Sequence, residues 1–146
     1  MGKAANSSIS LKQIHVTDNF WNKYVHLVKD VIIPYQWDIL NDKLEDVETS
    51  HCIENFKIAA GEKEGEFQGA VFQDTDVAKW LEAVGFVLNY ERDEKLEELA
   101  DETIELIGRA QQPDGYLNTY FTIKEPDGRW SNLMEGHELY TAGHMI

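Results

Sequence analysis

The stretch DTDVAKWLEAVGFVLNYERDEKLEELADETIELIGRA (residues 74–110) decides the fold class of this chain. Its apolar residues recur every three or four positions, and this period predicts amphipathic helices over Val77–Tyr90 and Glu94–Ala110. Because only a few residues around Glu91–Asp93 connect them, the two helices are expected to lie antiparallel as an αα-hairpin. The inward positions are expected to be Val77, Trp80, Leu81, Val84, Val87, Leu88, Leu96, Leu99, Ala100, Thr103, Ile104 and Ile107.

The same helical period extends in both directions from this hairpin. Apolar residues from Asp18 to Leu40 predict a long helix, which Pro34 is expected to kink or split because proline lacks a backbone N–H. A shorter helix is expected over His51–Ala60. Residues 137–146 predict a final amphipathic helix, and the chain stops inside it, so we expect the polypeptide to be the front portion of something larger.

These patterns predict an all-α fold. Wide apolar helix faces joined by loops suit a layered helical architecture, and little β-branched alternation supports a large sheet. Residues 1–17 are expected to form a tail or, around Ile14–Val16, a short edge strand. Residues 18–146 are expected to form one helical domain.

The composition limits the classes of function. The 146 residues include 13 basic and 27 acidic side chains, and a net charge of −14 would repel nucleic acid. The single cysteine, Cys52, excludes an intramolecular disulfide and cannot alone build a thiolate metal site. No segment resembles a signal peptide or approaches the roughly 20 apolar residues that cross a bilayer. A cytoplasmic location without membrane contact is the default expectation.

Two pairs of titratable residues could carry chemistry. His137 and His144 share a helix face, but the zinc-protease spacing would need a histidine where Thr141 stands, so substrate contact or a core role is favoured over metal binding. Asp74 and Asp76 are a carboxylate pair of the kind that glycoside hydrolases use. The pattern favours the simpler interpretation, in which they are acids at a helix start that cap backbone amides or interact with the helix dipole.

An aromatic cluster is expected mostly in a loop, where rings with polar edges can stack on sugars. The alternative, a satellite cluster that packs the loop down, is equally favoured. Glu138 is expected to be a surface charge, and Cys52 a buried small residue rather than a nucleophile. The members of the cluster are Tyr116, Tyr120, Phe121, Trp130 and Tyr140.

An ordered series of motifs, added to the helix hairpin, resembles the N-terminal part of glycoside hydrolase family 127, whose best-known members are β-L-arabinofuranosidases. The similarity extends over nearly the whole chain from about residue 14. The combination is specific, although each motif alone would be weak. The motifs are NFWNKY (19–24), VIIPYQW (31–37), NFKIAAGE (55–62), FQDTDVAKWLEA (72–83), AQQPDGYLNTYFT (110–122), RWSNL (129–133) and HELYTAGHMI (137–146).

The resemblance implies the opening helices of an (α/α)6-barrel catalytic domain, which is followed by β-sandwich domains in much longer family members. It also implies a retaining mechanism with a cysteine nucleophile, a glutamate acid/base and a zinc ion held by a glutamate and several cysteines. Those residues belong to a later, cysteine-rich part of the family's sequence. This chain is therefore expected to hold no catalytic residue and no metal ligand, and Cys52 receives no catalytic role.

Four residues are expected to contact substrate. His137 matches the family's histidine in the HELY motif, which helps to hold the sugar. Asp74 and Asp76 match paired acids near the pocket rim, and Tyr120 comes from the aromatic cluster.

Three places depart from the family pattern or vary within it. Ala78 stands where many members have tyrosine, which puts a packing or rim contact in doubt, and Thr141 stands where many have cysteine, a change expected to be benign. The segment between Leu40 and His51 is short, and members vary here in a loop near the substrate.

Three functional hypotheses follow. The first is part of a glycosidase that supplies contacts to an arabinose-containing saccharide and is inactive alone. The second is a stand-alone carbohydrate-binding module, and the third is a structural helical partner protein. Self-association through exposed apolar helix faces is an additional expectation.

Overall fold

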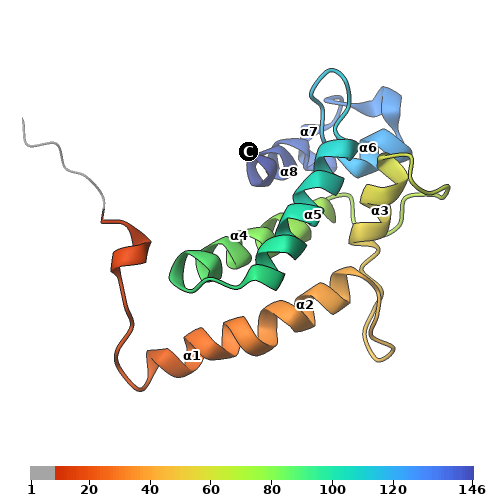
Figure 1. Ribbon diagram of the computed structural model, residues 1–146. Coiled ribbons are helices and arrows are strands. Elements are labelled where there is room, and N and C mark those ends of the chain that lie inside the picture. Colours follow the sequence, from red (N-terminus) through yellow and green to blue (C-terminus); the bar gives the residue numbers. More distant parts are fainter. Residues whose placement is uncertain (1–8) are drawn as a thin grey trace, which may run out of the picture.

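The computed structural model describes residues 9–146, and all regular secondary structure in that range is helical (Figure 1). The all-α prediction is confirmed, and none of the described helices is long and apolar enough to cross a membrane. The elements are η1 (Leu11–Gln13), α1 (Trp21–Leu27), η2 (Val28–Ile32), α2 (Ile33–Leu40), α3 (Cys52–Ala59), α4 (Asp74–Tyr90), α5 (Glu94–Ala110), α6 (Thr119–Ile123), η3 (Pro126–Gly128), α7 (Leu133–Gly136) and α8 (Glu138–Met145).

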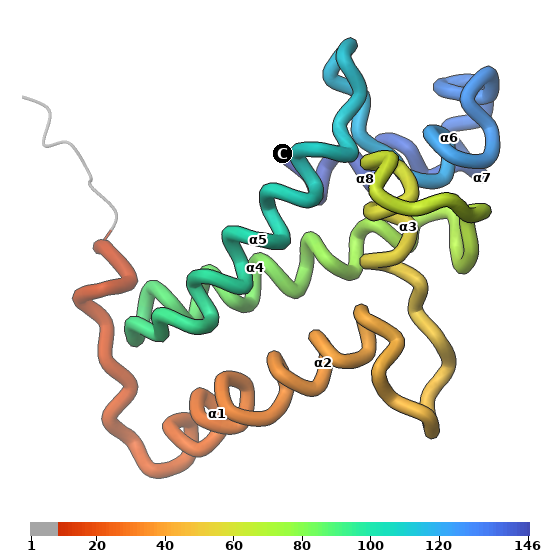
Figure 2. The backbone as a smooth tube through the Cα atoms, turned by 45° about the vertical axis from the view of Figure 1, so that its right-hand side comes forward, coloured from red at the N-terminus to blue at the C-terminus, as the bar shows by residue number. Residues whose placement is uncertain are grey.

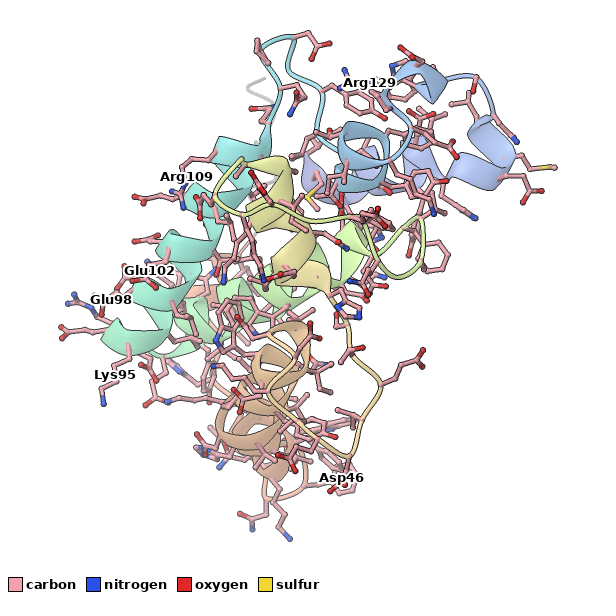
Figure 3. All side chains as sticks on the ribbon, turned by 90° about the vertical axis from the view of Figure 1, so that its right-hand side faces the viewer. Asp46, Lys95, Glu98, Glu102, Arg109 and Arg129 are labelled. Carbon is pink, nitrogen blue, oxygen red and sulfur yellow. The ribbon has the colours of Figure 1, made fainter. Side chains whose placement is uncertain are left out.

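The hairpin of α4 and α5 forms the centre of the fold, and its two helices run side by side (Figure 2). The side chain of Asp93 starts α5 by accepting a hydrogen bond from the Leu96 amide at 3.1 Å. The inward face of α5 differs from the prediction at one position, because Ile104 is exposed and Leu106 is buried instead. The outer face of α5 is charged, and Figure 3 shows Lys95, Glu98 and Glu102 along it. Arg109, near the C-terminal end of α5, donates a hydrogen bond to Glu62 at 2.6 Å.

The first long helical segment is continuous but not uniform. A π-helical turn, η2, joins α1 to α2, and Pro34 follows directly in the first turn of α2. The predicted interruption therefore takes the form of one wide turn and leaves a single helical path. α2 packs on α4 through Trp80, whose indole Nε1 donates to the Ile33 carbonyl at 3.1 Å and whose ring centroid lies 4.5 Å from that of Trp37.

The N-terminal segment forms no strand within the described residues. η1 precedes Ile14–Val16, which has no regular secondary structure, so the prediction of an edge strand there is wrong. The rest of the predicted tail, residues 1–8, lies outside the described range. The His15 ring lies 6.1 Å from the Tyr90 ring, which connects this segment to the C-terminal end of α4.

The segment between α5 and α8 is more helical than predicted. Asn118 and Asn132 start α6 and α7, because their side chains accept hydrogen bonds from the amides of Phe121 and Glu135. Tyr120 and Phe121 therefore lie on a short helix and not in a loop. These short helices lie beside the N-terminal ends of α4 and α8 (Figure 1).

The core lies between α2, α3, α4 and α5. Trp80, Phe56 and Ile33 are its largest fully buried apolar side chains. The predicted inward face of α4 is confirmed, because its members are buried or packed against this core.

Candidate functional site

Asp74 is a buried carboxylate that joins two helices. Its side chain is 2% exposed, and its two oxygens accept hydrogen bonds from the Thr119 amide at 2.7 Å and the Thr119 hydroxyl at 2.5 Å. Burial raises the pKa of Asp74 to about 6, although both hydrogen bonds act to lower it. The prediction that Asp74 caps α4 is wrong, because its side chain fastens the start of α4 to α6 instead.

Asp76 lies one turn into the accessible side of α4, among polar neighbours. Its carboxylate accepts a hydrogen bond from Gln73 Nε2 at 2.9 Å and lies 3.7 Å from Lys79 Nζ. Lys79 also donates to the Thr75 hydroxyl at 3.0 Å. Asp74 and Asp76 are thus a structural carboxyl and an accessible carboxylate, so they do not form a pair with shared chemistry.

His137 lies at the junction of α7 and α8 and has a left-handed backbone, with φ of 50°. Non-glycine residues with this conformation often occur at functional sites, where packing maintains the strain. The imidazole lies 5.2 Å from the Phe72 ring and 6.3 Å from the Tyr140 ring, by centroid distances. The ring centroid of Tyr140 in turn lies 4.8 Å from that of His144. The structure therefore confirms that His137 and His144 lie on the same side of α8, together with Tyr140.

Lys79 connects the residues around His137 with those around Asp76. Lys79 Nζ lies 5.5 Å from the Tyr140 ring centroid, and α4 packs on α8. Lys79 and then Thr75 lower the pKa of the Tyr140 phenol through hydrogen bonding. The candidate functional site is therefore the surface formed by Asp76, Lys79, His137 and Tyr140.

Tyr120 lies in a different cluster. Its hydroxyl donates to Glu125 at 2.9 Å, and its ring contacts those of Phe67 and Phe121. Within residues 9–146 no ring contact or hydrogen bond connects it to His137. The predicted aromatic cluster is thus divided: Tyr120 packs on Phe121, Tyr116 packs on Trp130, and Tyr140 lies at the candidate site.

Glu138 is a central residue that the sequence pattern did not identify. The prediction that it is a surface charge is wrong, because it is 2% exposed. One carboxylate oxygen accepts a hydrogen bond from the Tyr116 hydroxyl, and the other accepts one from the Trp130 amide at 2.7 Å. Burial and then this bond raise the pKa of Tyr116. Glu138 therefore holds the segment 116–130 against α8, directly beside His137.

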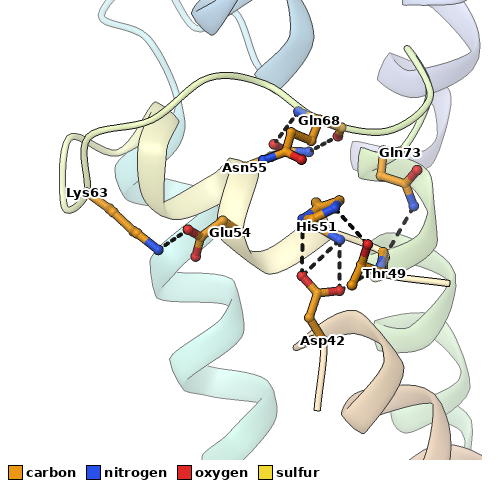
Figure 4. Close-up of polar contacts among 9 residues, drawn as sticks. Asp42, Thr49, His51, Glu54, Asn55, Lys63, Gln68 and Gln73 are labelled. Atoms are coloured by element: carbon orange, nitrogen blue, oxygen red, sulfur yellow. Dashed lines mark hydrogen bonds and ion pairs between the residues drawn. The ribbon is translucent and has the colours of Figure 1, made fainter. Parts of the chain in front are cut away.

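A loop latch, which we define as Asp42, Ser50 and His51, fixes the chain between α2 and α3 (Figure 4). Asp42 Oδ1 accepts hydrogen bonds from the amides of Ser50 at 2.6 Å and His51 at 3.0 Å. Gln73 Nε2 then donates to the Ser50 hydroxyl at 3.3 Å. The latch thus connects the loop of residues 41–51 to the start of α4, next to Asp76.

Cys52 is buried, as predicted, and its thiol donates to the Gln73 carbonyl at 3.4 Å. Burial, followed by the nearby charge of Asp74, raises the pKa of the thiol well above its usual value. Among residues 9–146, no group of three or more His, Cys, Asp or Glu side chains is arranged to hold a metal ion. The described residues therefore do not fit the zinc ion that the family resemblance implies.

The comparisons with known proteins define the class of this chain. Residues 13–146 match the family model for the GH127 catalytic domain of β-L-arabinofuranosidases. The chain belongs to this glycoside hydrolase family.

Particular relatives share both its sequence and its fold. A non-reducing end β-L-arabinofuranosidase of Bifidobacterium longum is 40% identical over 149 residues, which cover 91% of this chain and 23% of that protein. The crystal structure of a GH127 β-L-arabinofuranosidase from Geobacillus stearothermophilus T6 is 62% identical with a TM-score of 0.89, over 91% of this chain and 21% of that one. A second GH127 β-arabinofuranosidase structure is 31% identical with a TM-score of 0.82, over 94% and 22%. The chain thus spans about a fifth of the length of these relatives.

Proposed function

We propose that this chain is the N-terminal part of the catalytic domain of a retaining β-L-arabinofuranosidase and contributes contacts to the terminal arabinofuranosyl group. The position of His137 carries the proposal. Its imidazole forms a three-ring cluster with Phe72 and Tyr140 at a strained helix start, and its ring nitrogens have no hydrogen-bond partner among residues 9–146. They are therefore available to the hydroxyl groups of a sugar. The family match and the activities of the relatives supply the reaction class.

The remaining parts of the proposal concern the longer protein. The helices would begin an (α/α)6 barrel, and the nucleophile, the acid/base and the zinc ligands would come from sequence outside this chain, as the family resemblance implies. The partner would be an arabinose-containing saccharide. We propose a cytoplasmic protein without nucleic-acid partners, given the net charge of −14. The exposed apolar side chains of α1, such as Trp21 and Tyr24, support self-association of the isolated chain.

A chimaera tests the proposal directly. This chain replaces the matching fifth of the Geobacillus stearothermophilus relative, and hydrolysis of p-nitrophenyl β-L-arabinofuranoside is measured. We expect turnover by the chimaera and a loss of at least about a hundredfold in kcat/KM for His137→Ala, in line with the loss of a substrate-positioning contact. His26→Ala is the matched control, because His26 lies on exposed α1, remote from the site.

The outcomes separate the functional hypotheses. Turnover that is unchanged by His137→Ala removes this residue from the substrate site. Saturable binding of methyl β-L-arabinofuranoside to the isolated chain, together with an inactive but folded chimaera, would favour the stand-alone carbohydrate-binding module. A folded chain with neither binding nor turnover would favour the structural partner protein.

A further inference from the structure

A hollow of about 430 Å³ lies between α2 and the first half of α4. Its size falls within the range of roughly 300–1,000 Å³ that small-molecule sites occupy. The polar part of its wall comes from three separate segments, namely Gln36 of α2, Ser50 before α3, and Asp76 and Lys79 of α4. The side chains of Leu40 and Trp80 contribute the apolar part.

The polar wall is held in place before any ligand binds. Gln73 bridges two of its members, because Nε2 donates to the Ser50 hydroxyl at 3.3 Å and to the Asp76 carboxylate at 2.9 Å. The loop latch fixes Ser50 itself through the bond from its amide to Asp42 (Figure 4). Lys79 is held by the Thr75 hydroxyl. Such preorganisation lowers the entropy lost on binding.

The hollow adjoins the candidate functional site through shared residues. Asp76 and Lys79 belong to both, and Lys79 Nζ lies 5.5 Å from the Tyr140 ring, which is next to His137. The hollow and the surface at His137 are therefore joined along α4 at Asp76 and Lys79.

We propose that this hollow is a second saccharide subsite, which binds the sugar unit glycosidically linked to the terminal arabinofuranosyl group. An amide, a hydroxyl, a carboxylate and an ammonium group distributed over the wall offer both donors and acceptors, as a neutral polyhydroxylated ring requires. The wall carries one acidic and one basic side chain, so its charge favours a neutral ligand over a highly charged one. This inference rests on the proposed function, because it assumes a sugar at His137.

A second hollow along α4 does not fit a saccharide. It measures about 550 Å³ and lies at the opposite end of α4, where Trp21, Tyr24 and Phe86 contribute to a wall that is almost entirely apolar. Burying sugar hydroxyl groups there would leave them without hydrogen bonds. Of these two hollows along α4, the one beside Asp76 and Lys79 offers the hydrogen-bond partners that a sugar requires.

Two ligands test the inference on the 146-residue chain. Its amide NMR spectrum is titrated with methyl β-L-arabinofuranoside and with a disaccharide that carries a β-L-arabinofuranosyl group on a second arabinofuranose. We expect the disaccharide to bind about tenfold more tightly, which corresponds to one or two added hydrogen bonds. Its addition should also shift the amide signals of Gln36, Ser50 and Ala83, which the monosaccharide leaves in place.

Gln36→Leu isolates the subsite, because Gln36 is exposed on α2 and lies outside the His137 surface. We expect this variant to lose most of the tenfold preference for the disaccharide and to bind the monosaccharide as before. Gln13→Leu, on exposed η1, is the matched control and should change neither affinity.

The outcomes distinguish the subsite from the function on which it rests. Equal affinity for both sugars, with amide shifts confined to the surroundings of His137 and Tyr140, overturns the subsite and leaves the proposed function standing. Loss of monosaccharide affinity in Gln36→Leu overturns the assignment of a separate subsite. If neither sugar shifts any amide signal of the folded chain, the subsite is overturned, whereas the proposed function is decided separately by turnover of the chimaera.

Discussion

The two ends of α4 have the same apolar inner face but opposite surroundings. At the N-terminal end, Asp74 accepts hydrogen bonds from Thr119 of α6, and Gln73 donates one to Ser50 in the loop after α2. Lys79 lies 5.5 Å from the Tyr140 ring of α8. At the C-terminal end, the neighbours of Phe86 are apolar side chains of α1 and the segment before it, which line the 550 Å³ hollow. The periodic pattern of a helix therefore predicts its burial, while its functional end depends on which other segments reach it.

The effect of substitutions on the free energy of unfolding should differ between the two ends of α4 in the same way. Around the N-terminal end, the carboxyl groups of Asp74 and Glu138 are buried and paired, so removal of one partner leaves another without a hydrogen bond. At the C-terminal end, aromatic rings remain half exposed, so their removal exposes little that was buried. We expect large effects at the first end and small effects at the second.

The largest effect is expected for Glu138→Ala. This change leaves the Tyr116 hydroxyl and the Trp130 amide without their acceptor, and about 2 kcal/mol for each orphaned group gives a loss of about 4 kcal/mol in the free energy of unfolding. Urea denaturation measures it. Glu135→Ala, on the exposed side of α7, is the control and should stay within about 0.5 kcal/mol. Similar losses in both variants would show that the buried contacts of Glu138 do not stabilise the fold.

Asp74 should give the chain an unusual dependence of stability on pH. Its folded-state pKa of about 6 lies above the ordinary value of 3.8, so the folded chain binds more protons between these values than the unfolded chain does. The contribution of Asp74 to stability is therefore fully present below about pH 3.8 and is lost as the pH rises through about 6. A shift of about two pKa units corresponds to about 3 kcal/mol.

Comparison with Asp74→Asn isolates this effect from the other carboxyl groups. The free energy of unfolding of the unsubstituted chain, minus that of the variant, should fall by about 3 kcal/mol from acidic to neutral pH. Asp76→Asn, at an accessible position, is the control and should show no such fall. A difference that stays constant with pH would contradict the raised pKa of Asp74.

A smaller, local effect is expected at Tyr140. Lys79 is the main cause of its lowered pKa, so Lys79→Met should raise the pKa of the phenol towards its ordinary value. Ultraviolet titration of tyrosinate absorbance, compared with a Tyr140→Phe variant to assign the signal, measures the shift. An unchanged pKa of Tyr140 in Lys79→Met would show that Lys79 does not connect the residues around His137 with those around Asp76.

The smallest effect is expected at the apolar end of α4. Phe86 is 57% exposed, so Phe86→Ser should change the free energy of unfolding by about 0.5 kcal/mol or less. Thermal denaturation checks this. Val84→Ser, at a fully buried position of the same helix, is the comparison and should destabilise the chain. A large loss from Phe86→Ser would show that the apolar hollow contributes to the core.

The helices were predictable because their apolar period is strong and local. α5 begins and ends where the pattern placed it, and α3 differs by one residue at each end. The exchange of Ile104 for Leu106 arose because both lie near the edge of one apolar stripe, where the pattern cannot decide which side the neighbouring helices cover.

The candidate site was only partly predictable because its contacts are distant in sequence. His137 was found through the HELY motif, and its neighbour Tyr140 through helical spacing. Glu138 was missed because a charged residue in an amphipathic helix is usually exposed, and its partners lie 22 and 8 residues away. For Asp74 the partner Thr119 is 45 residues away, so no local spacing could reveal its burial.

The wide turn η2 determines how far α1 is rotated about its own axis relative to α2. A π-helical turn contains one residue more than an α-helical turn, so the same residues wound as an uninterrupted α-helix would turn the chain further by one residue. Each residue of an α-helix turns the chain by about 100°, so α1 would rotate by that angle against α2. Trp21 and Tyr24 would leave the wall of the apolar hollow, while the bond from Trp80 to Ile33 would hold α2 in place. The π-helical geometry of η2 thus decides which side of α1 faces α4.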